Sequence, residues 1–323
     1  LEYPPFRARG SLSSRSGLVF HVRKFNDALI KLSYELSNLM IQDINYISNQ
    51  TGLNNWFDFN SWAAFKQPFS EKALVALSQS LASVMASVIG KSKKILISDL
   101  DDTLWSGIVG DDGVDGILIG PDTAKGELFF IIQKYLLFII KSGVIFSIVS
   151  KNDPNTVNEA FKKKRDDMPI NLELSSSSKV NWVQKSKNVR EILIELNLLP
   201  DSAIFIDDSD LECLDVETNT KGCIAISYQN SPIELIKKID SMGFFEVQSV
   251  NSSDQSRTQY YKDNNLREKL IEQSNSYEKF LESLKMKTSV KWKLGKNIDR
   301  ASQLTKKTNQ FNLTQVSLCL LYT

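Results

Sequence analysis

The sequence is poor in the side chains that several enzyme classes need. It has a single histidine, His21, outside every motif described below, so a histidine-based catalytic triad is not expected. Its three cysteines, Cys213, Cys223 and Cys319, form no CxxC or metal-ligand spacing, and their odd number favours a reducing compartment. These shortages exclude triad esterases, cysteine-based zinc sites and disulfide scaffolds.

An excess of charge and long apolar runs are also missing. The 39 basic and 38 acidic residues leave a net charge of +1, which offers no general attraction to nucleic acid or to an anionic membrane. Apolar runs such as LLFII at 136–140 are far too short to span a bilayer, and the opening LEYPPFRARG has no signal core. We therefore expect a cytoplasmic protein without nucleic-acid or membrane partners.

Two helical segments are predicted in the first third of the chain. Apolar residues recur at helical spacing over 25–40 and over 71–90. The aromatic stretch between them, NNWFDFNSWAAFKQPF, indicates a packed loop with a short helix. The length of 323 residues favours roughly two domains, so a second pattern is expected further along.

From residue 94 short apolar runs alternate with helical stretches. This alternation predicts βαβ units, and hence an α/β fold with a parallel sheet and helices on both faces. Glycines punctuate 105–120 and predict a hairpin-like excursion after the first strand, while the serine-rich 171–182 is predicted to be a loop. The expected strands are 95–100, 143–149 and 202–206, and the expected helices lie near 124–141, 154–164 and 183–197.

Each predicted strand of this region ends in polar side chains. The first, KKILISDLDDTL, delivers Asp99, Asp101 and Thr103. Ligands gather at the carboxyl ends of strands in open α/β sheets, so all these side chains are expected to share one crevice. The second strand ends in Ser150 with Asn152, the third ends in Asp207 with Asp208, and Lys185 precedes the helix between them.

Carboxylates that converge in this way need a hard cation, and Mg²⁺ takes a few carboxylates together with waters and phosphate oxygens. An aspartate at such a site is a competent nucleophile toward phosphorus. Asp99 and Asp101 share a face of the strand, so one can attack while the other handles the leaving-group proton. Ser150 suits phosphoryl oxygens near the helix start at Asp153-Pro154, and Lys185 suits the negative charge of the transition state.

This order of motifs resembles the haloacid dehalogenase (HAD) superfamily, and within it the type IIIC, FkbH-like branch. The resemblance implies a HAD-like Rossmannoid sheet and a Mg²⁺ cofactor, with 105–120 as a flap over the site. Trp105 is expected to pack at the base of this flap rather than to touch substrate. It rests on DLDDTLWSGIVGDDG, GVIFSIVSKND, VNWVQKSKN, IFIDDSDLE and ASQLTKKTNQFNLT, between about residues 55 and 314.

The resemblance also implies a role for each site residue. Asp99 is then the nucleophile, Asp101 the general acid and base, and Ser150 and Lys185 the phosphate binders. Apart from the resemblance, Thr103 and Asn152 are candidate substrate contacts, and Asn152 fits a turn residue equally well. The metal ligands are Asp99, Asp101, Asp207 and Asp208, with Asp208 in support.

The flanking segments resemble the neighbours of the HAD domain in longer relatives. Residues 1–91 are similar to the end of an SGNH-hydrolase-like domain, 92–245 to the HAD domain, and 246–323 to a linker helix and the start of an acetyltransferase-like (GNAT) domain. A strand is expected over 285–294. Because the family pattern stops after Thr314, we expect a piece of a longer protein with an unrelated tail at 315–323.

The predicted function is Mg²⁺-dependent phosphoryl transfer from a small phosphorylated substrate. The FkbH-like resemblance implies a narrower task, glyceryl transfer from 1,3-bisphosphoglycerate to an acyl carrier protein, and the alternative is a simple metabolite phosphatase. Val149 stands where the family commonly carries a cysteine, so an acyl relay through an enzyme thiol is not expected. A signalling receiver or an inactive scaffold is a more remote alternative, because Asp207-Asp208 after Lys185 does not fit a receiver.

Overall fold

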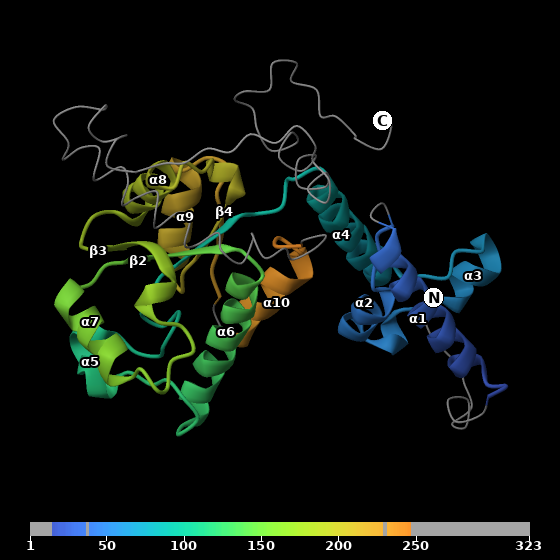
Figure 1. Ribbon diagram of the computed structural model, residues 1–323, viewed down its shortest axis with the longest axis horizontal. Coiled ribbons are helices and arrows are strands. Elements are labelled where there is room, and N and C mark those ends of the chain that lie inside the picture. Colours follow the sequence, from blue (N-terminus) through green and yellow to red (C-terminus); the bar gives the residue numbers. More distant parts are fainter. Residues whose placement is uncertain (1–14, 37–38, 229–230, 247–323) are drawn as a thin grey trace, which may run out of the picture. The chain divides into compact units, whose positions relative to one another are not determined.

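A five-stranded parallel sheet organises the chain in the computed structural model, which describes residues 15–36, 39–228 and 231–246 (Figure 1). The strand order is β3-β2-β1-β4-β5, so β1 is central and pairs with β2 and β4. The apolar runs form these strands because their side chains are buried on both faces of the sheet. The strands are β1 (Ile95–Ser98), β2 (Ile145–Ser150), β3 (Ser175–Val180), β4 (Ala203–Ile206) and β5 (Ile224–Ile226).

Helices cover both faces of the sheet, as the sequence predicts. Side chains alternate along β1, so Leu96 packs in one core cluster and Ile95 and Ile97 pack in the other. The Leu96 side holds α6 (Ala124–Lys141), α7 (Pro154–Lys163) and α10 (Ile233–Met242). The opposite side holds α8 (Lys185–Glu195) and α9 (Asp210–Asn219). The sheet is therefore the middle layer of three.

The prediction of a loop over 171–182 is wrong. This segment contains a short 3₁₀ helix (Leu172–Leu174) and then β3, the strand at the edge of the sheet. Four serines carry no apolar alternation, so the sequence pattern gave no strand signal. Parallel pairing with β2, which includes a register shift between Phe146 and Ile148, makes the strand instead. Main-chain pairing with a neighbour outweighs the poor strand pattern here.

The excursion between β1 and α6 has the predicted hairpin-like form. Ser106 and Leu118 bridge in antiparallel fashion, with N–H to oxygen distances of 3.0 and 2.9 Å. Between them lies the short helix α5 (Val109–Gly116), which the sequence analysis did not predict. Gly107 has a φ of 97°, and a Cβ there would lie 2.8 Å from Asp112 Oδ2, so a glycine is required.

Four helices precede the sheet: α1 (Leu18–Glu35), α2 (Ile44–Thr51), α3 (Phe59–Phe65) and α4 (Glu71–Val88). α4 confirms the helix predicted from residue 71, and α3 with the 3₁₀ turn Leu53–Asn55 confirms the short helix in the aromatic stretch. α1 begins earlier than predicted and ends at Glu35. A small core built around Ile47, Trp56 and Ala73 joins α2 and α4.

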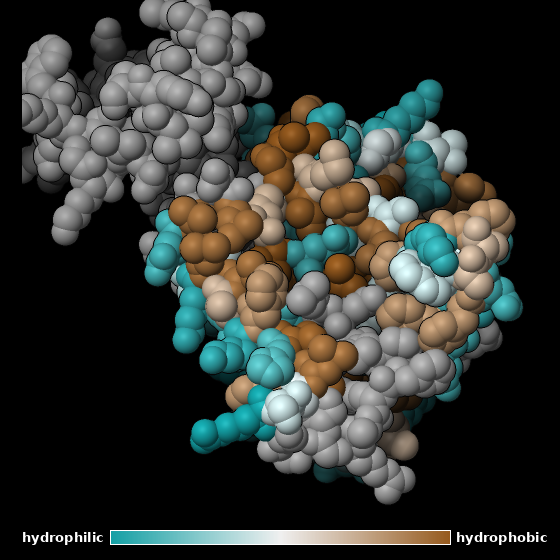
Figure 2. Space-filling view, turned by 90° about the vertical axis from the view of Figure 1, so that its right-hand side faces the viewer, coloured by the Kyte–Doolittle hydropathy of each residue, from teal (hydrophilic) through white to brown (hydrophobic). Residues whose placement is uncertain are grey.

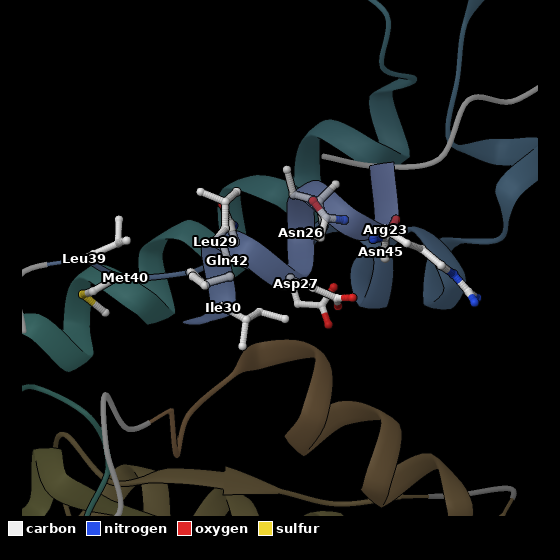
Figure 3. Close-up of a pocket in the computed structure, with 12 residues that line it drawn as sticks. Arg23, Asn26, Asp27, Leu29, Ile30, Leu39, Met40, Gln42 and Asn45 are labelled. Atoms are coloured by element: carbon white, nitrogen blue, oxygen red, sulfur yellow. The ribbon is translucent and has the colours of Figure 1, made fainter. Parts of the chain in front are cut away.

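These helices carry many exposed apolar side chains, and Figure 2 shows apolar residues gathered on this side of the molecule. α4 also meets α10, where Ser83 Oγ donates to the Met242 carbonyl at 2.9 Å. A cavity of about 660 Å³ lies between α1 and residues 39–45, lined in part by Arg23, Asp27 and Met40 (Figure 3). It contains none of the predicted site residues.

Two expectations are not decided by the fold. The linker helix and the strand predicted beyond residue 246 lie outside the described residues. The division at 91 and 245 stays a prediction, since the N-terminal helices and the sheet fall in one compact unit, Leu1–Leu266. Among the described helices, none is both long and apolar enough to cross a membrane.

Candidate active site

The acids after β1 and β4 are positioned by the sheet itself. The Asp99 N–H donates to the Ile206 carbonyl at 2.9 Å, and the Asp207 N–H donates to the Ile226 carbonyl at 3.2 Å. Each aspartate therefore continues the main-chain pairing of its strand, and neighbouring parallel strands end together. Asp99 and Asp207 are buried, at 4% and 0% exposure. The ends of β1 and β4 therefore bring these two acids together at the carboxyl edge of the sheet.

Lys185 joins these two aspartates. It is the first residue of α8, and its Nζ lies 3.0 Å from Asp99 Oδ2 and 2.6 Å from Asp207 Oδ2. Burial by itself lowers the pKa of Lys185, but the charges of Asp99 and Asp207 outweigh burial and raise it above its ordinary value. Lys185 is therefore held as a cation between two carboxylates.

The carboxylates carry more negative charge than Lys185 can balance. Asp99, Asp207 and Asp208 bring carboxylate oxygens within 4.8 Å of one another, with Asp208 exposed. Burial raises the pKa of Asp99 and of Asp207 to about 6, although the charge of Lys185 opposes both shifts. Burial, and next the charge of Asp99, also raises the pKa of Asp208.

This donor set fits a hard divalent cation. Three carboxylates face one ammonium group, and oxygen ligands are those that Mg²⁺ prefers. Asp99 Oδ1 is buried and has no hydrogen-bond partner among the described residues, so this oxygen is available to coordinate a cation. Asp99, Asp207 and Asp208 are the residues that would hold the ion.

Asp101 lies in a different environment. Its Oδ1 accepts from the Trp105 indole N–H at 2.9 Å and from the Val109 N–H at 3.1 Å. Its Oδ2 accepts from Asn152 Nδ2 at 2.8 Å. The carboxylate group that gathers at 4.8 Å does not include Asp101, so its predicted role as a metal ligand stays a prediction.

Asn152 links Asp101 to the end of β2. The same Nδ2 group donates to Ser150 Oγ at 3.0 Å, and both Asn152 and Ser150 are buried. As predicted, Asp153 and Pro154 open α7, where Asp153 accepts from the N–H groups of Asn155 and Thr156. Asn152 therefore joins the predicted proton donor to the predicted phosphate binder, and its substrate contact stays untested.

Thr103 is fully buried, and its Oγ1 has no hydrogen-bond partner among the described residues. Its predicted contact with substrate also stays a prediction. The flap reaches the site through α5, whose first N–H donates to Asp101. A Cβ at Gly110 would lie 3.8 Å from Asn152 Oδ1, so this helix lies directly against Asn152.

Several contacts of the site were missed by the sequence analysis. The Trp105 N–H bond to Asp101 spans four residues, and a tryptophan so close to an acid was the available signal. Lys151 pairs with Glu212 of α9, and the Tyr228 hydroxyl donates to the Asp102 carbonyl. No sequence spacing indicates the last two, because their partners are far apart along the chain.

No protein-family profile matches the chain, and no curated protein matches it either. Among solved structures, it is similar to the N-terminal part of BF1531 from Bacteroides fragilis, a crystal structure that contains a phosphatase domain complexed with Mg. The TM-score is 0.71 and the identity 29%, over 74% of this chain and 64% of that one. The chain thus spans less than two thirds of that relative.

Two further structures are much less similar. The cobalt-bound deoxy-D-mannose-octulosonate 8-phosphate phosphatase YrbI from Haemophilus influenzae shares 11% identity at a TM-score of 0.32, over 61% of this chain and 97% of that one. An uncharacterised protein from Corynebacterium glutamicum shares 16% identity at a TM-score of 0.31, over 47% and 96%. Neither likeness carries weight here.

The sheet, the helices on both faces and the similarity to the Bacteroides fragilis structure together define an α/β protein of the Rossmann-like class. This is the HAD-like Rossmannoid sheet that the sequence predicts, and the acidic cluster lies at the carboxyl ends of β1 and β4.

Proposed function

We propose that the chain is a Mg²⁺-dependent phosphatase of the haloacid dehalogenase type that acts through an aspartyl-phosphate on Asp99. One observation carries the proposal: a buried Asp99–Lys185–Asp207 arrangement with Asp208 beside it, at the ends of two adjacent strands. The similarity to a phosphatase-domain structure complexed with Mg supports both the activity and the cofactor.

Each residue then has a defined task. Asp99 attacks phosphorus while the bond to the leaving oxygen breaks, and Asp101 gives that oxygen a proton. Water next attacks the phosphoryl group on Asp99 and gives a proton to Asp101, while the bond between phosphorus and the Asp99 oxygen breaks and phosphate leaves. Lys185 keeps Asp99 ionised, and Ser150 contacts phosphoryl oxygens. Mg²⁺ held by Asp99, Asp207 and Asp208 would neutralise negative charge on the phosphoryl group.

Steady-state hydrolysis of p-nitrophenyl phosphate tests this function. We expect turnover with Mg²⁺, loss of turnover with excess chelator, and no turnover in Asp99→Asn. Asp166→Asn, the same change at an exposed acid outside the cluster, is the matched control and should keep wild-type turnover. Equal rates of p-nitrophenyl phosphate hydrolysis with chelator and with Mg²⁺ would contradict the proposal.

A narrower proposal rests on the FkbH-like sequence resemblance alone: glyceryl transfer from 1,3-bisphosphoglycerate to an acyl carrier protein. Val149, at the position of the family cysteine, packs fully buried in the cluster beneath α8 and α9. A thiol relay at that position has no support, so we favour the plain phosphatase.

A reducing, cytoplasmic setting fits the buried free thiols of Cys213 and Cys223.

Intact-protein mass spectrometry separates these two readings. After incubation with 1,3-bisphosphoglycerate, we expect phosphate release and no hydroxylamine-labile glyceryl adduct on the wild-type protein. Such an adduct would favour the glyceryl-transfer reading through another thiol.

A further inference from the structure

Asp101 is oriented by the first part of the flap. The Trp105 indole N–H and the Val109 N–H both donate to Oδ1, at 2.9 and 3.1 Å. An ionised carboxylate has about four acceptor sites, two on each oxygen. Both sites on Oδ1 are therefore used. Among the described residues Oδ2 accepts only from Asn152, so Oδ2 keeps the one site at which a proton can be exchanged.

Trp105 is well placed to fix this orientation. Its side chain is fully buried in the core between the sheet and α7. Its ring meets Phe161 edge to face, with centroids 5.4 Å apart and an interplanar angle of 73°. A buried indole N–H needs an acceptor, and here Asp101 supplies it. The packed ring thus presents its N–H group to Asp101 from one fixed direction.

We propose that Trp105 is a positioning residue that turns Asp101 Oδ2 toward the leaving-group oxygen; this inference rests on the proposed phosphatase function. In the first step the Asp99 oxygen–phosphorus bond forms, the ester phosphorus–oxygen bond breaks, and the proton on Oδ2 moves to the departing oxygen. Without the indole N–H, the carboxyl group turns away from that oxygen for part of the time. Trp105 itself touches no reacting atom.

The dependence of kcat/KM on the leaving group tests this role, because kcat/KM reports only the steps through phosphoryl transfer to Asp99. In Trp105→Phe we expect kcat/KM for phenyl phosphate, whose leaving oxygen needs a proton, to fall roughly tenfold, the upper range for the loss of one hydrogen bond. For 2,4-dinitrophenyl phosphate, whose leaving oxygen needs none, kcat/KM should stay within about twofold.

Two controls separate positioning from packing. Trp56→Phe makes the same change at a fully buried tryptophan of the N-terminal helices and should alter neither substrate's kcat/KM. Phe161→Leu loosens the packing around Trp105 but keeps its N–H group, so any loss should be equal for both esters. Equal losses for both esters in Trp105→Phe, or no loss for either, would overturn the positioning role.

A spectroscopic measurement keeps the inference testable if Trp105→Phe does not fold or if the wild type hydrolyses neither ester. Absence of wild-type turnover would count against the proposed function, not against this contact. The Trp105 indole N–H resonance should shift upfield in Asp101→Ala, while that of Trp56 stays in place. An unmoved Trp105 resonance would mean that Trp105 does not donate to Asp101, and the inference would fail.

Discussion

Asp99 and Asp101 lie two residues apart, yet the two sides of the crevice hold their carboxylates by opposite means. On one side a single buried cation, Lys185, touches both Asp99 and Asp207. On the other side neutral N–H donors, from Trp105, Val109 and Asn152, donate hydrogen bonds to Asp101. Charge balance holds the carboxylates on the first side, and the direction of hydrogen bonds holds the carboxylate on the second.

The difference matches the chemistry proposed for each aspartate. A nucleophile needs to stay ionised, and the charge of Lys185 favours the ionised form of Asp99. A proton carrier needs a fixed orientation more than a nearby charge, because proton transfer depends on hydrogen-bond geometry. Four substitutions or additions would break or sharpen this contrast.

Removal of the shared cation should have the largest effect. Lys185→Met leaves Asp99 and Asp207 buried without their partner, which lowers the free energy of unfolding by about 3–5 kcal/mol in chelator. Urea denaturation measures the loss. Lys187→Met, at an exposed lysine of the same helix, is the control and should change stability by less than about 0.5 kcal/mol. Equal losses in both variants would contradict the charge-balance account.

Added Mg²⁺ should stabilise the charged side of the crevice. At a hundredfold excess over its dissociation constant, an ion bound only by the folded state adds about 2.7 kcal/mol, because binding shifts the folding equilibrium. Thermal unfolding with and without Mg²⁺ measures it. Asp99→Asn should lose most of this gain, whereas Asp166→Asn should keep it. A gain of the same size in Asp99→Asn would place the ion elsewhere.

Loss of Asn152 should affect the hydrogen-bonded side to a smaller degree. Asn152→Ala removes the amide that serves Asp101 Oδ2 and Ser150 Oγ, and both of these groups stay largely inside the protein. We expect the free energy of unfolding to fall by about 2 kcal/mol, because buried acceptors lose a donor. Asn158→Ala, on the exposed face of α7, is the control in the same denaturation series. If Asn152→Ala lowered the free energy of unfolding no more than Asn158→Ala does, these hydrogen bonds would not contribute to stability.

The smallest effect is expected at the half-buried ion pair of Lys151 and Glu212 beside the site. Lys151→Met should lower the free energy of unfolding by at most about 1 kcal/mol, because solvent screens both charges. A double-mutant cycle with Glu212→Gln isolates the pair. A coupling energy as large as the loss in Lys185→Met would show that the greater burial of Lys185 does not make its ion pairs stronger than the Lys151–Glu212 pair.

The sequence pattern predicted those parts of the fold that local periodicity encodes. The apolar runs over 95–100, 143–149 and 202–206 contain β1, β4 and most of β2, because a strand buried on both faces needs consecutive apolar residues. β3 was missed because its serines pair through the main chain, which side-chain patterns do not report. α5 was missed because glycine-rich segments have low helix propensity.

For the site, the sequence alone determined which acids reach the carboxyl edge of the sheet, since strand ends and residue order suffice for that. The tertiary structure decided how each acid is held. Lys185 meets Asp207 across 22 positions of the chain, and Asn152 meets Asp101 across 51. Such contacts follow from the packing of α8 and of the loop after β2 against the sheet. Local sequence carries no record of them, because burial and hydrogen-bond direction arise only when distant segments pack together.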